Sequence, residues 1–156
     1  KTAASEFEIL APVSGELVHL EKTNDPAFSS RAVGDGVAVV PQEGTVCAPV
    51  SGTVAALFPT EHALGIMSDD SSAQVMLHIG IDTVKLEGKG FHALVAQGDH
   101  VDAGQPLVEV DFDAVRVAGF DPTVFVIVCE RSEKSTLREH ASGPVAVKEP
   151  VVWLSE

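Results

Sequence analysis

The 156-residue sequence is poor in cysteine and in basic side chains, and it has no long hydrophobic run. Its two cysteines, Cys47 and Cys129, lie far apart and form no Cys-x-x-Cys pattern, so they suggest no cysteine chemistry. We expect both to be buried, reduced thiols, as in a cytoplasmic protein. No apolar stretch approaches the ~20 residues that span a bilayer, and the N-terminus lacks the basic and then apolar layout of a signal peptide. These absences predict a cytoplasmic protein with no direct membrane insertion.

Basic residues are outnumbered, with 10 lysines and arginines against 23 acidic side chains and a formal net charge of −13. Nucleic acids and anionic membranes bind basic surfaces, so this charge argues against both as direct partners. It favours a protein partner with a basic docking face. Another interpretation is that the acidity only keeps the protein soluble. The length fits one domain over residues 1–156, which we expect to be monomeric, with residues 1–7 as a flexible N-terminal segment.

The sequence does contain many short, apolar, β-branched runs separated by Gly, Pro, Asn and Asp, a pattern typical of β-sandwiches and barrels. Strands are expected at Glu16–His19, Val37–Val40, Thr53–Leu57, Val75–Ile79, Pro106–Val110, Thr123–Val128 and Pro150–Leu154. Helices are expected only over the charged stretch Arg131–His140, anchored by Leu137, and as one turn around Asp113–Val117. The sequence therefore predicts an all-β protein with a few short helices.

Two pairs of repeated sequence features indicate a duplication. The segment Ala11–Gly15 returns verbatim as Ala48–Gly52, and each copy precedes an expected strand. Further along, Val101 and Pro106 are matched in spacing by Val145 and Pro150. Because a solenoid needs at least three stacked repeats, two copies instead suggest two similar halves around one core.

Six histidines are present, and His78 is the one that stands inside a strand-length apolar segment, Gln74–Asp82. Period-two alternation puts Met76, His78 and Gly80 on one face and three aliphatic side chains on the other. If the aliphatic face is core, His78 points outward, and Gly80 leaves space for a large group to approach the imidazole. The alternative is a half-buried histidine whose ring nitrogens are satisfied by the backbone.

A second histidine gives His78 a companion. A hairpin that joins the strands Thr53–Leu57 and Val75–Ile79 would bring His62 alongside His78. One imidazole could then act as a nucleophile, while the other orients it or donates to a phosphoryl oxygen, with Thr60 fixing its tautomer. Two imidazoles can equally form half of a metal site, so both chemistries stay open.

Several segments, taken in order, resemble the glucose-type enzyme IIA domain of the bacterial phosphoenolpyruvate-dependent sugar phosphotransferase system. They are Ala11–Val18, Val33–Val39, Ala48–Val54, Thr60–Ala63, Leu77–Val84, Leu86–Phe91, Gly98–Val101, Gly143–Val145 and Pro150–Val152. The most specific is the one that contains His78. The family commonly has Gly and Glu where Ser72 and Gln74 stand here, which puts the shape of the preceding turn in question.

The resemblance implies an antiparallel β-sandwich of the duplicated hybrid type and a phosphotransferase component. It implies that His78 accepts a phosphoryl group on Nε2, that His62 supports onward transfer, and that Thr60 orients His62. The donor would be the phosphocarrier HPr and the acceptor a cysteine of a IIB domain, with no cofactor beyond the covalent phosphoryl group. An apolar docking surface with an acidic rim would comprise Phe28, Val33, Phe58, Met76, Val84, Asp25 and Asp82. The sugar cannot be read here, because specificity resides in the IIB and IIC domains.

Three alternatives belong to other classes. A biotinyl or lipoyl carrier needs a lysine at a hairpin tip, and neither Lys85 nor Lys89 has that setting. A lysostaphin-type zinc site needs an His-x-His pair and three protein ligands, whereas Gly80 stands two residues after His78. On this view His62 and His78 could hold only weak, adventitious or regulatory zinc. A purely structural binding module would tolerate replacement of His78.

Overall fold

The computed structural model describes residues 6–70 and 72–155 and has an all-β architecture with a few short helices, as expected. The strands are β1 (Glu6–Leu10), β2 (Gly15–His19), β3 (Asp35–Pro41), β4 (Thr45–Cys47), β5 (Gly52–Leu57), β6 (Ala63–Ser68), β7 (Ala73–Ile79), β8 (Phe91–Ala93), β9 (His100–Val101), β10 (Pro106–Val110), β11 (Val124–Arg131), β12 (Thr136–Glu139), β13 (Gly143–Val145) and β14 (Pro150–Ser155). The helices are α1 (Pro26–Ser29) and α2 (Phe112–Val117), with 3₁₀ turns η2 (Leu20–Lys22) and η3 (Thr83–Leu86).

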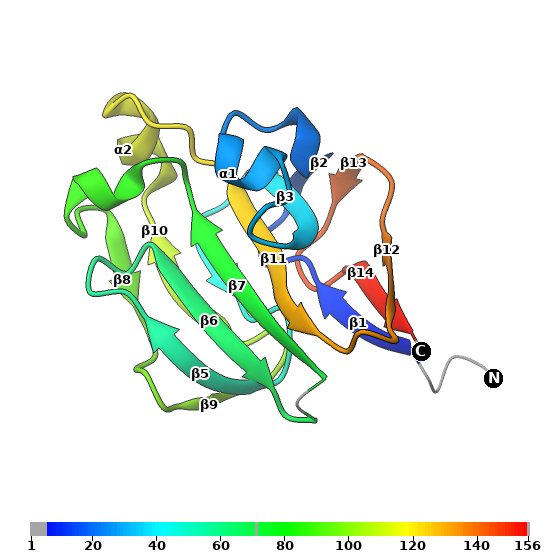
Figure 1. Ribbon diagram of the computed structural model, residues 1–156. Helices are drawn as coiled ribbons and strands as arrows, with labels where there is room; N and C mark the ends of the chain where they lie inside the picture. The colour runs from blue at the N-terminus through cyan, green and yellow to red at the C-terminus, as the bar shows by residue number, and fades with distance from the viewer. Residues whose placement is uncertain (1–5, 71, 156) are drawn as a thin grey trace.

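These strands form three antiparallel sheets. The largest has the order β13-β2-β3-β11-β7-β6-β5-β9, and the two smaller sheets have the orders β1-β14-β12 and β4-β10-β8. Figure 1 shows β5, β6, β7 and β11 side by side across the front, with β1, β14 and β12 to their right. One continuous core of buried aliphatic side chains draws on all three sheets, which makes the fold a β-sandwich.

The duplication expected from the sequence is visible in the backbone. Gly15 pairs with Val145 and Gly52 pairs with Val101, so the repeated segments begin equivalent strands at the two ends of the large sheet. The two copies are also joined by a reciprocal pair of hydrogen bonds. The Leu10 amide donates to the Pro49 carbonyl, and the Cys47 amide donates to the Pro12 carbonyl. The two donors are 37 residues apart, and so are the two acceptors, which is the shift between the copies. The central pair β7 and β11 therefore lies at the middle of two similar halves.

The two small sheets obey the same relation. Val108 on β10 pairs with Ala93 on β8, and Val152 on β14 pairs with Glu139 on β12. Val108 and Val152 are separated by the same interval as Pro106 and Pro150, so Ala93 and Glu139 occupy equivalent positions.

The prediction of a helix over Arg131–His140 is wrong. Arg131 ends β11, a turn held by the Ser132 hydroxyl follows, and Thr136–Glu139 is a strand. Leu137 pairs with Leu154 of β14, so the stretch alternates between exposed and half-buried positions instead of forming a helical face. The gain from pairing with a distant strand outweighs the local helix propensity of charged residues. The short helix around Asp113–Val117 is confirmed as α2, capped by the Asp111 side chain.

Several strands of the structure were not predicted from the sequence, among them the one that pairs with β7 opposite β11. Ala63–Ser68 forms β6, which lies between β5 and β7, so the hairpin that leads into β7 starts from β6. The segment is buried on both faces and therefore lacks the polar alternation that marks a half-buried strand.

The expected flexible segment, residues 1–7, lies partly outside the described residues. Of the part that is described, Glu6 and Phe7 belong to β1 and pair with Ser155 and Leu154. The two cysteines are free thiols, Cys47 buried and Cys129 half-buried.

Candidate active site

His78 lies on β7, near the middle of the large sheet. The alternation expected from the sequence is confirmed, because Val75, Leu77 and Ile79 are fully buried while Met76 and His78 are half-buried on the other face. The strand is held between β6 and β11, where Ala63 and Phe125 are the direct cross-strand neighbours of His78.

The backbone fixes the tautomer of His78. Its Nδ1 lies 2.8 Å from the carbonyl oxygen of Gly80. A carbonyl can only accept, so Nδ1 carries the hydrogen and donates it. The lone pair of the neutral ring is therefore on Nε2, which makes no hydrogen bond within the described residues. The strand thus presents Nε2 of His78 as the free nucleophilic atom.

Gly80 has a role different from the one expected. Its φ of +81° lies in the left-handed region, and a side chain there would overlap Thr83 and press on the Asp121 carbonyl. The space beside Gly80 is therefore filled by protein and is no approach route for a ligand. Glycine is needed because the chain turns sharply enough for its carbonyl to reach back to His78.

Replacing Gly80 with alanine is expected to lower the free energy of unfolding by about 2–4 kcal/mol, because backbone strain and overlap with Thr83 add together. It should also displace the carbonyl that holds Nδ1 of His78, so both imidazole tautomers become visible by ¹⁵N NMR. Gly119→Ala is the matched control, since its φ is +93° with no atom within 4 Å. Equal losses in the two variants would contradict this account.

His62 lies beside His78 at the end of the β5–β6 connection. The two ring centroids are 5.1 Å apart with planes 85° apart, and His62 is only 3% exposed. The His62 carbonyl accepts from the Ile79 amide at 2.7 Å, so β7 itself holds the turn in place. The Thr60 hydroxyl lies 2.5 Å from Nδ1 of His62. The structure therefore brings together all three residues that the sequence put in the site.

Both imidazoles are neutral at neutral pH. Burial, and then the neighbouring His78, lower the pKa of His62 to about 4. Burial also lowers the pKa of His78, although the Gly80 carbonyl and the Asp25 and Asp82 carboxylates oppose that shift. The Thr60 hydroxyl can donate to Nδ1 of His62, and in that tautomer Nε2 carries the hydrogen and can donate to an anionic group beside His78.

Aromatic side chains form a wall against the two imidazoles. The Phe28 ring lies 5.2 Å from that of His78 and stacks on Phe125 at 4.4 Å, while Phe58 meets His62 edge-on at 5.4 Å. Phe28 is only 5% exposed and belongs to a small buried cluster, so it supports the surface from below.

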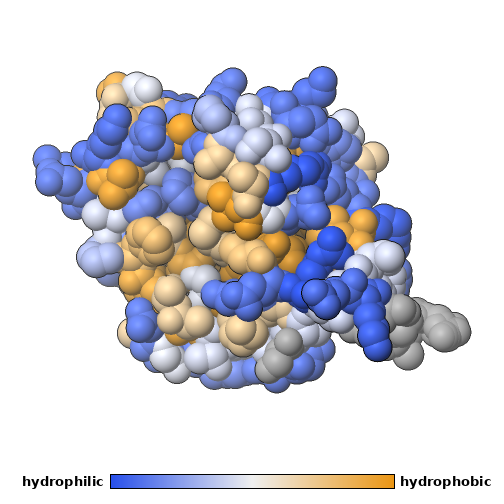
Figure 2. All heavy atoms as spheres, viewed as in Figure 1, coloured by the Kyte–Doolittle hydropathy of each residue, from blue (hydrophilic) through white to orange (hydrophobic). Residues whose placement is uncertain are grey.

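The other residues expected on a docking surface are more accessible. Val33, Phe58 and Val84 are 38%, 46% and 49% exposed, and Met76 is half-buried. Figure 2 shows hydrophobic side chains gathered across the middle of the face that β6, β7 and β11 cross, with hydrophilic side chains around them. An apolar area of this kind suits a protein partner.

The two aspartates expected on the rim begin short helices near His78. Asp25 caps α1 by accepting from the Ala27 amide, and Asp82 precedes η3 with a left-handed backbone. Both carboxylates lie close enough to raise the pKa of His78, which places negative charge beside the imidazole pair.

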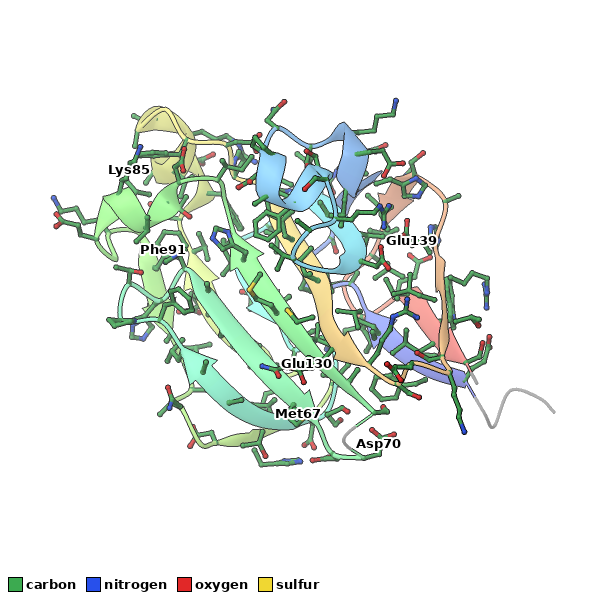
Figure 3. All side chains as sticks on the ribbon, viewed as in Figure 1. Met67, Asp70, Lys85, Phe91, Glu130 and Glu139 are labelled. Carbon is green, nitrogen blue, oxygen red and sulfur yellow. The ribbon has the colours of Figure 1, made fainter. Side chains whose placement is uncertain are left out.

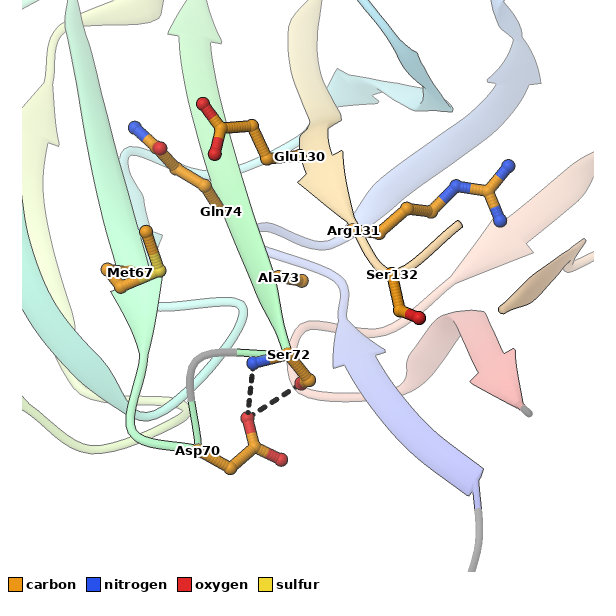
Figure 4. Close-up of a pocket in the computed structure, with 8 residues that line it drawn as sticks. All are labelled: Met67, Asp70, Ser72, Ala73, Gln74, Glu130, Arg131 and Ser132. Carbon is orange, nitrogen blue, oxygen red and sulfur yellow. Dashed lines mark hydrogen bonds between the residues drawn. The ribbon is translucent and has the colours of Figure 1, made fainter. Parts of the chain in front are cut away.

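A separate hollow lies away from the histidines. It has a volume of about 450 Å³ and is lined by Met67, Asp70, Ser72, Ala73, Gln74, Glu130, Arg131 and Ser132, at the opposite end of β7. Figure 4 shows Asp70 bonded to Ser72 in the turn that closes it. No histidine lines this hollow, so it is separate from the paired imidazoles.

The alternative classes find no support in the geometry. Lys85 is in η3 and Lys89 follows it, so neither stands at the tip of a β-hairpin as a carrier lysine would. Over residues 6–70 and 72–155, no group of three or more His, Cys, Asp or Glu side chains is placed to hold a metal ion.

Comparison with known proteins agrees with the fold. A family model described as phosphoenolpyruvate-dependent sugar phosphotransferase system, EIIA 1, matches residues 7–134. The solved structure of the glucose permease IIA from Mycoplasma capricolum superposes with a TM-score of 0.87 at 35% identity, covering 95% of each chain. The fold is thus that of a IIA domain. This chain belongs to the EIIA 1 family and is a component of the sugar phosphotransferase system.

Curated relatives are longer. The chain is 41% identical to the glucose-specific EIICBA component of Streptococcus pneumoniae over 144 residues, which cover 92% of the chain and 20% of the relative. It is 42% identical to the β-glucoside-specific EIIBCA component of Bacillus subtilis over 147 residues, 94% of the chain and 24% of the relative. The chain therefore spans about a fifth to a quarter of these relatives. Within the described residues, no helix is long and apolar enough to cross a membrane.

Proposed function

We propose that this chain carries a phosphoryl group on Nε2 of His78, between the phosphocarrier HPr and a cysteine of a IIB domain. The observation that carries the proposal is the hydrogen bond from Nδ1 of His78 to the Gly80 carbonyl. It leaves Nε2 as the unprotonated nitrogen in a ring whose pKa is already lowered by burial. The relatives named EIICBA and EIIBCA support a IIB partner, and the cytoplasmic side of a sugar permease is the proposed site of action.

Acceptance begins when the Nε2 lone pair attacks the phosphorus of the phosphohistidine on HPr. The new P–N bond forms as the old one breaks, and the departing ring of HPr keeps the electron pair. His78 retains the hydrogen on Nδ1, held by the Gly80 carbonyl. The main requirements are alignment of the two nitrogens and stabilisation of the equatorial oxygens, to which the Nε2–H of His62 can donate.

Onward transfer reverses this pattern. A cysteine thiolate of the IIB domain attacks the phosphorus, the P–N bond breaks, and Nε2 of His78 recovers its lone pair. A carrier must release what it binds, and a neutral imidazole donor stabilises the phosphoryl group less tightly than a lysine would. The phenyl rings of Phe28 and Phe58 limit water around the pair, which protects the phosphohistidine from hydrolysis.

The docking surface fits partners with basic faces. Exposed Val33, Phe58 and Val84 supply apolar contact, and Asp25 and Asp82 supply negative charge beside the acceptor nitrogen. Such carboxylates steer encounter and fix the register more than they add affinity. The test of the proposal is incubation with phosphoenolpyruvate, enzyme I and HPr, followed by intact mass, which should show one acid-labile phosphoryl group.

The buried neutral His62 predicts a specific loss of stability in acid. In the unfolded chain His62 takes up a proton with the ordinary histidine pKa of ~6.5, whereas in the folded protein the pKa of His62 is about 4. The contribution of His62 to the free energy of unfolding should therefore be fully present above pH ~6.5 and smaller by about 2.5 kcal/mol at about pH 4.5. Urea unfolding at both pH values should show a smaller drop in His62→Gln than in the wild type. Equal drops would contradict the assignment.

A further inference from the structure

Two connections flank His78, one from each half of the duplicated fold. Residues 20–34 join β2 to β3, and residues 58–62 join the equivalent strands β5 and β6. The first connection places Phe28 against the His78 ring, and the second places His62 there. Each side of the imidazole is therefore set by a loop, and a loop needs an anchor to hold a side chain in one position.

In the first connection the anchor is Arg31, whose amide donates to the Phe28 carbonyl. Its backbone is left-handed, with φ of +62°. Its guanidinium reaches Glu139 at 2.7 Å, Glu21 at 2.9 Å and Asp35 at 3.1 Å. The Glu139 side chain is only 18% exposed, so this pair is shielded from solvent more than an ordinary surface ion pair.

The second connection has Glu61 in the same role. Glu61 also has φ of +62°, its amide donates to the Phe58 carbonyl, and it directly precedes His62. Its carboxylate accepts from the backbone amide of Ala93 on β8.

The two anchors end at equivalent places. Glu139 is on β12 and Ala93 is on β8, and the pairing described above makes these the same position in the two small sheets. Figure 3 shows Glu139 on one side of the molecule and Phe91, which begins β8, on the other, with β7 between them. Different side chains thus make the same mechanical connection in both halves.

We propose that Arg31 and Glu61 are positioning residues for phosphoryl transfer: Arg31 ties the loop that carries Phe28 to β12, and Glu61 ties the loop that carries His62 to β8. This role rests on the proposed function of His78. Neither side chain is placed to touch the phosphoryl group, and each acts through the aromatic or imidazole ring that its loop holds.

Loss of either anchor has a definite physical consequence. Without Arg31, the carboxylates of Glu21, Asp35 and Glu139 face one another in a chain of net charge −13, and Arg131 bonds only Asp35 among them. Their repulsion pushes the loop outward and withdraws Phe28 from His78. Without the Glu61 side chain, the Ala93 amide loses its partner, and the strained left-handed residue keeps only its backbone bond to the Phe58 carbonyl.

The test is a pH titration of both imidazoles by NMR on the unphosphorylated protein. The charged or titratable groups facing His78 are His62, Asp25 and Asp82. Arg31→Ala should raise the midpoint of His78 by about half a unit or more, because burial lowers its pKa and Phe28 supplies part of that burial. Glu61→Ala should raise the midpoint of His62 instead. Each variant is the control for the other, and Glu61→Gln should restore the wild-type titration because its amide oxygen accepts the same bond.

A charge-matched control is Arg138→Ala, which removes one cation from β12; within the described residues Arg138 pairs with Glu6 and stacks on Trp153. It should leave both midpoints unchanged. In transfer assays Arg31→Ala should slow acceptance from HPr and Glu61→Ala should slow onward transfer, each by ~10-fold. If Arg31→Ala does not fold, Glu139→Gln tests the same anchor with a smaller perturbation, because it removes one partner of Arg31.

Unchanged midpoints in Arg31→Ala, Glu139→Gln and Glu61→Ala, or shifts equal to those of Arg138→Ala, would overturn the proposal. The titration needs no phosphoryl group, so it can succeed even if His78 proves not to be the acceptor. Conversely, the wild type could be phosphorylated on His78 while the imidazole midpoints of the variants do not shift. The proposed function would then stand, and Arg31 and Glu61 would not be positioning residues.

Discussion

Replacing His78 with alanine is expected to abolish phosphoryl acceptance completely, with no mass gain after incubation with phosphoenolpyruvate, enzyme I and HPr. In the proposed mechanism Nε2 of His78 is the nucleophile to which the phosphorus bonds, and His62 is not placed to substitute for it. His62 is buried, and its Nδ1 is engaged by Thr60. A neutral donor Nε2–H has no lone pair with which to attack.

The control must separate loss of the nucleophile from loss of the fold. His78 is only half-buried and its aliphatic neighbours on β7 remain, so the urea midpoint of His78→Ala should stay close to that of the wild type. His92→Ala removes an exposed imidazole from β8 and should be phosphorylated normally. A phosphoryl group on His78→Ala would move the acceptor to another residue.

The sequence allowed this site to be located because its signal is local. The segment Gln74–Asp82 is long enough for period-two alternation to show which side His78 occupies. The closeness of His62 was also predicted, although through the wrong strand. β6 rather than β5 pairs with β7, and His62 immediately precedes Ala63, the cross-strand neighbour of His78.

The features that could not be predicted depend on distant partners. The stretch Thr136–Glu139 is a strand because β14 lies beside it, and nothing within its own residues announces that neighbour. The same holds for the anchors, since Arg31 meets Glu139 108 residues away and Glu61 meets Ala93 32 residues away. Their left-handed backbones give no signal either, because neither residue is a glycine.

The duplication places the proposed site between two similar halves of the fold. The two flanking loops are equivalent in position and each carries a phenylalanine, Phe28 or Phe58, but only the second also carries an imidazole, His62. Phe28 removes water from one side of His78, and His62 supplies a hydrogen-bond donor on the other. The two equivalent loops therefore contribute different side chains to the two sides of His78.

Replacing His62 with glutamine is expected to leave phosphoryl acceptance measurable but to slow transfer to the IIB cysteine by about 10²–10³-fold. In acceptance, the nucleophile is a neutral nitrogen whose tautomer is held by Gly80 and not by His62. In onward transfer, the attacking thiolate brings further negative charge towards a phosphoryl group that is already anionic. The Nε2–H of His62 is the donor placed to stabilise that charge, so its loss falls mainly on this step.

The measurement is a quenched-flow assay in which each variant is first charged by HPr and then mixed with a purified IIB domain. Thr60→Val should give an intermediate loss, because the imidazole remains while the hydroxyl that fixes its tautomer is removed. A glutamine side chain lacks the ring that meets Phe58 edge-on, so its amide is not held in the orientation of the imidazole. Transfer from His62→Gln at the wild-type rate would assign charge stabilisation to other donors and leave His62 as a merely structural neighbour of His78.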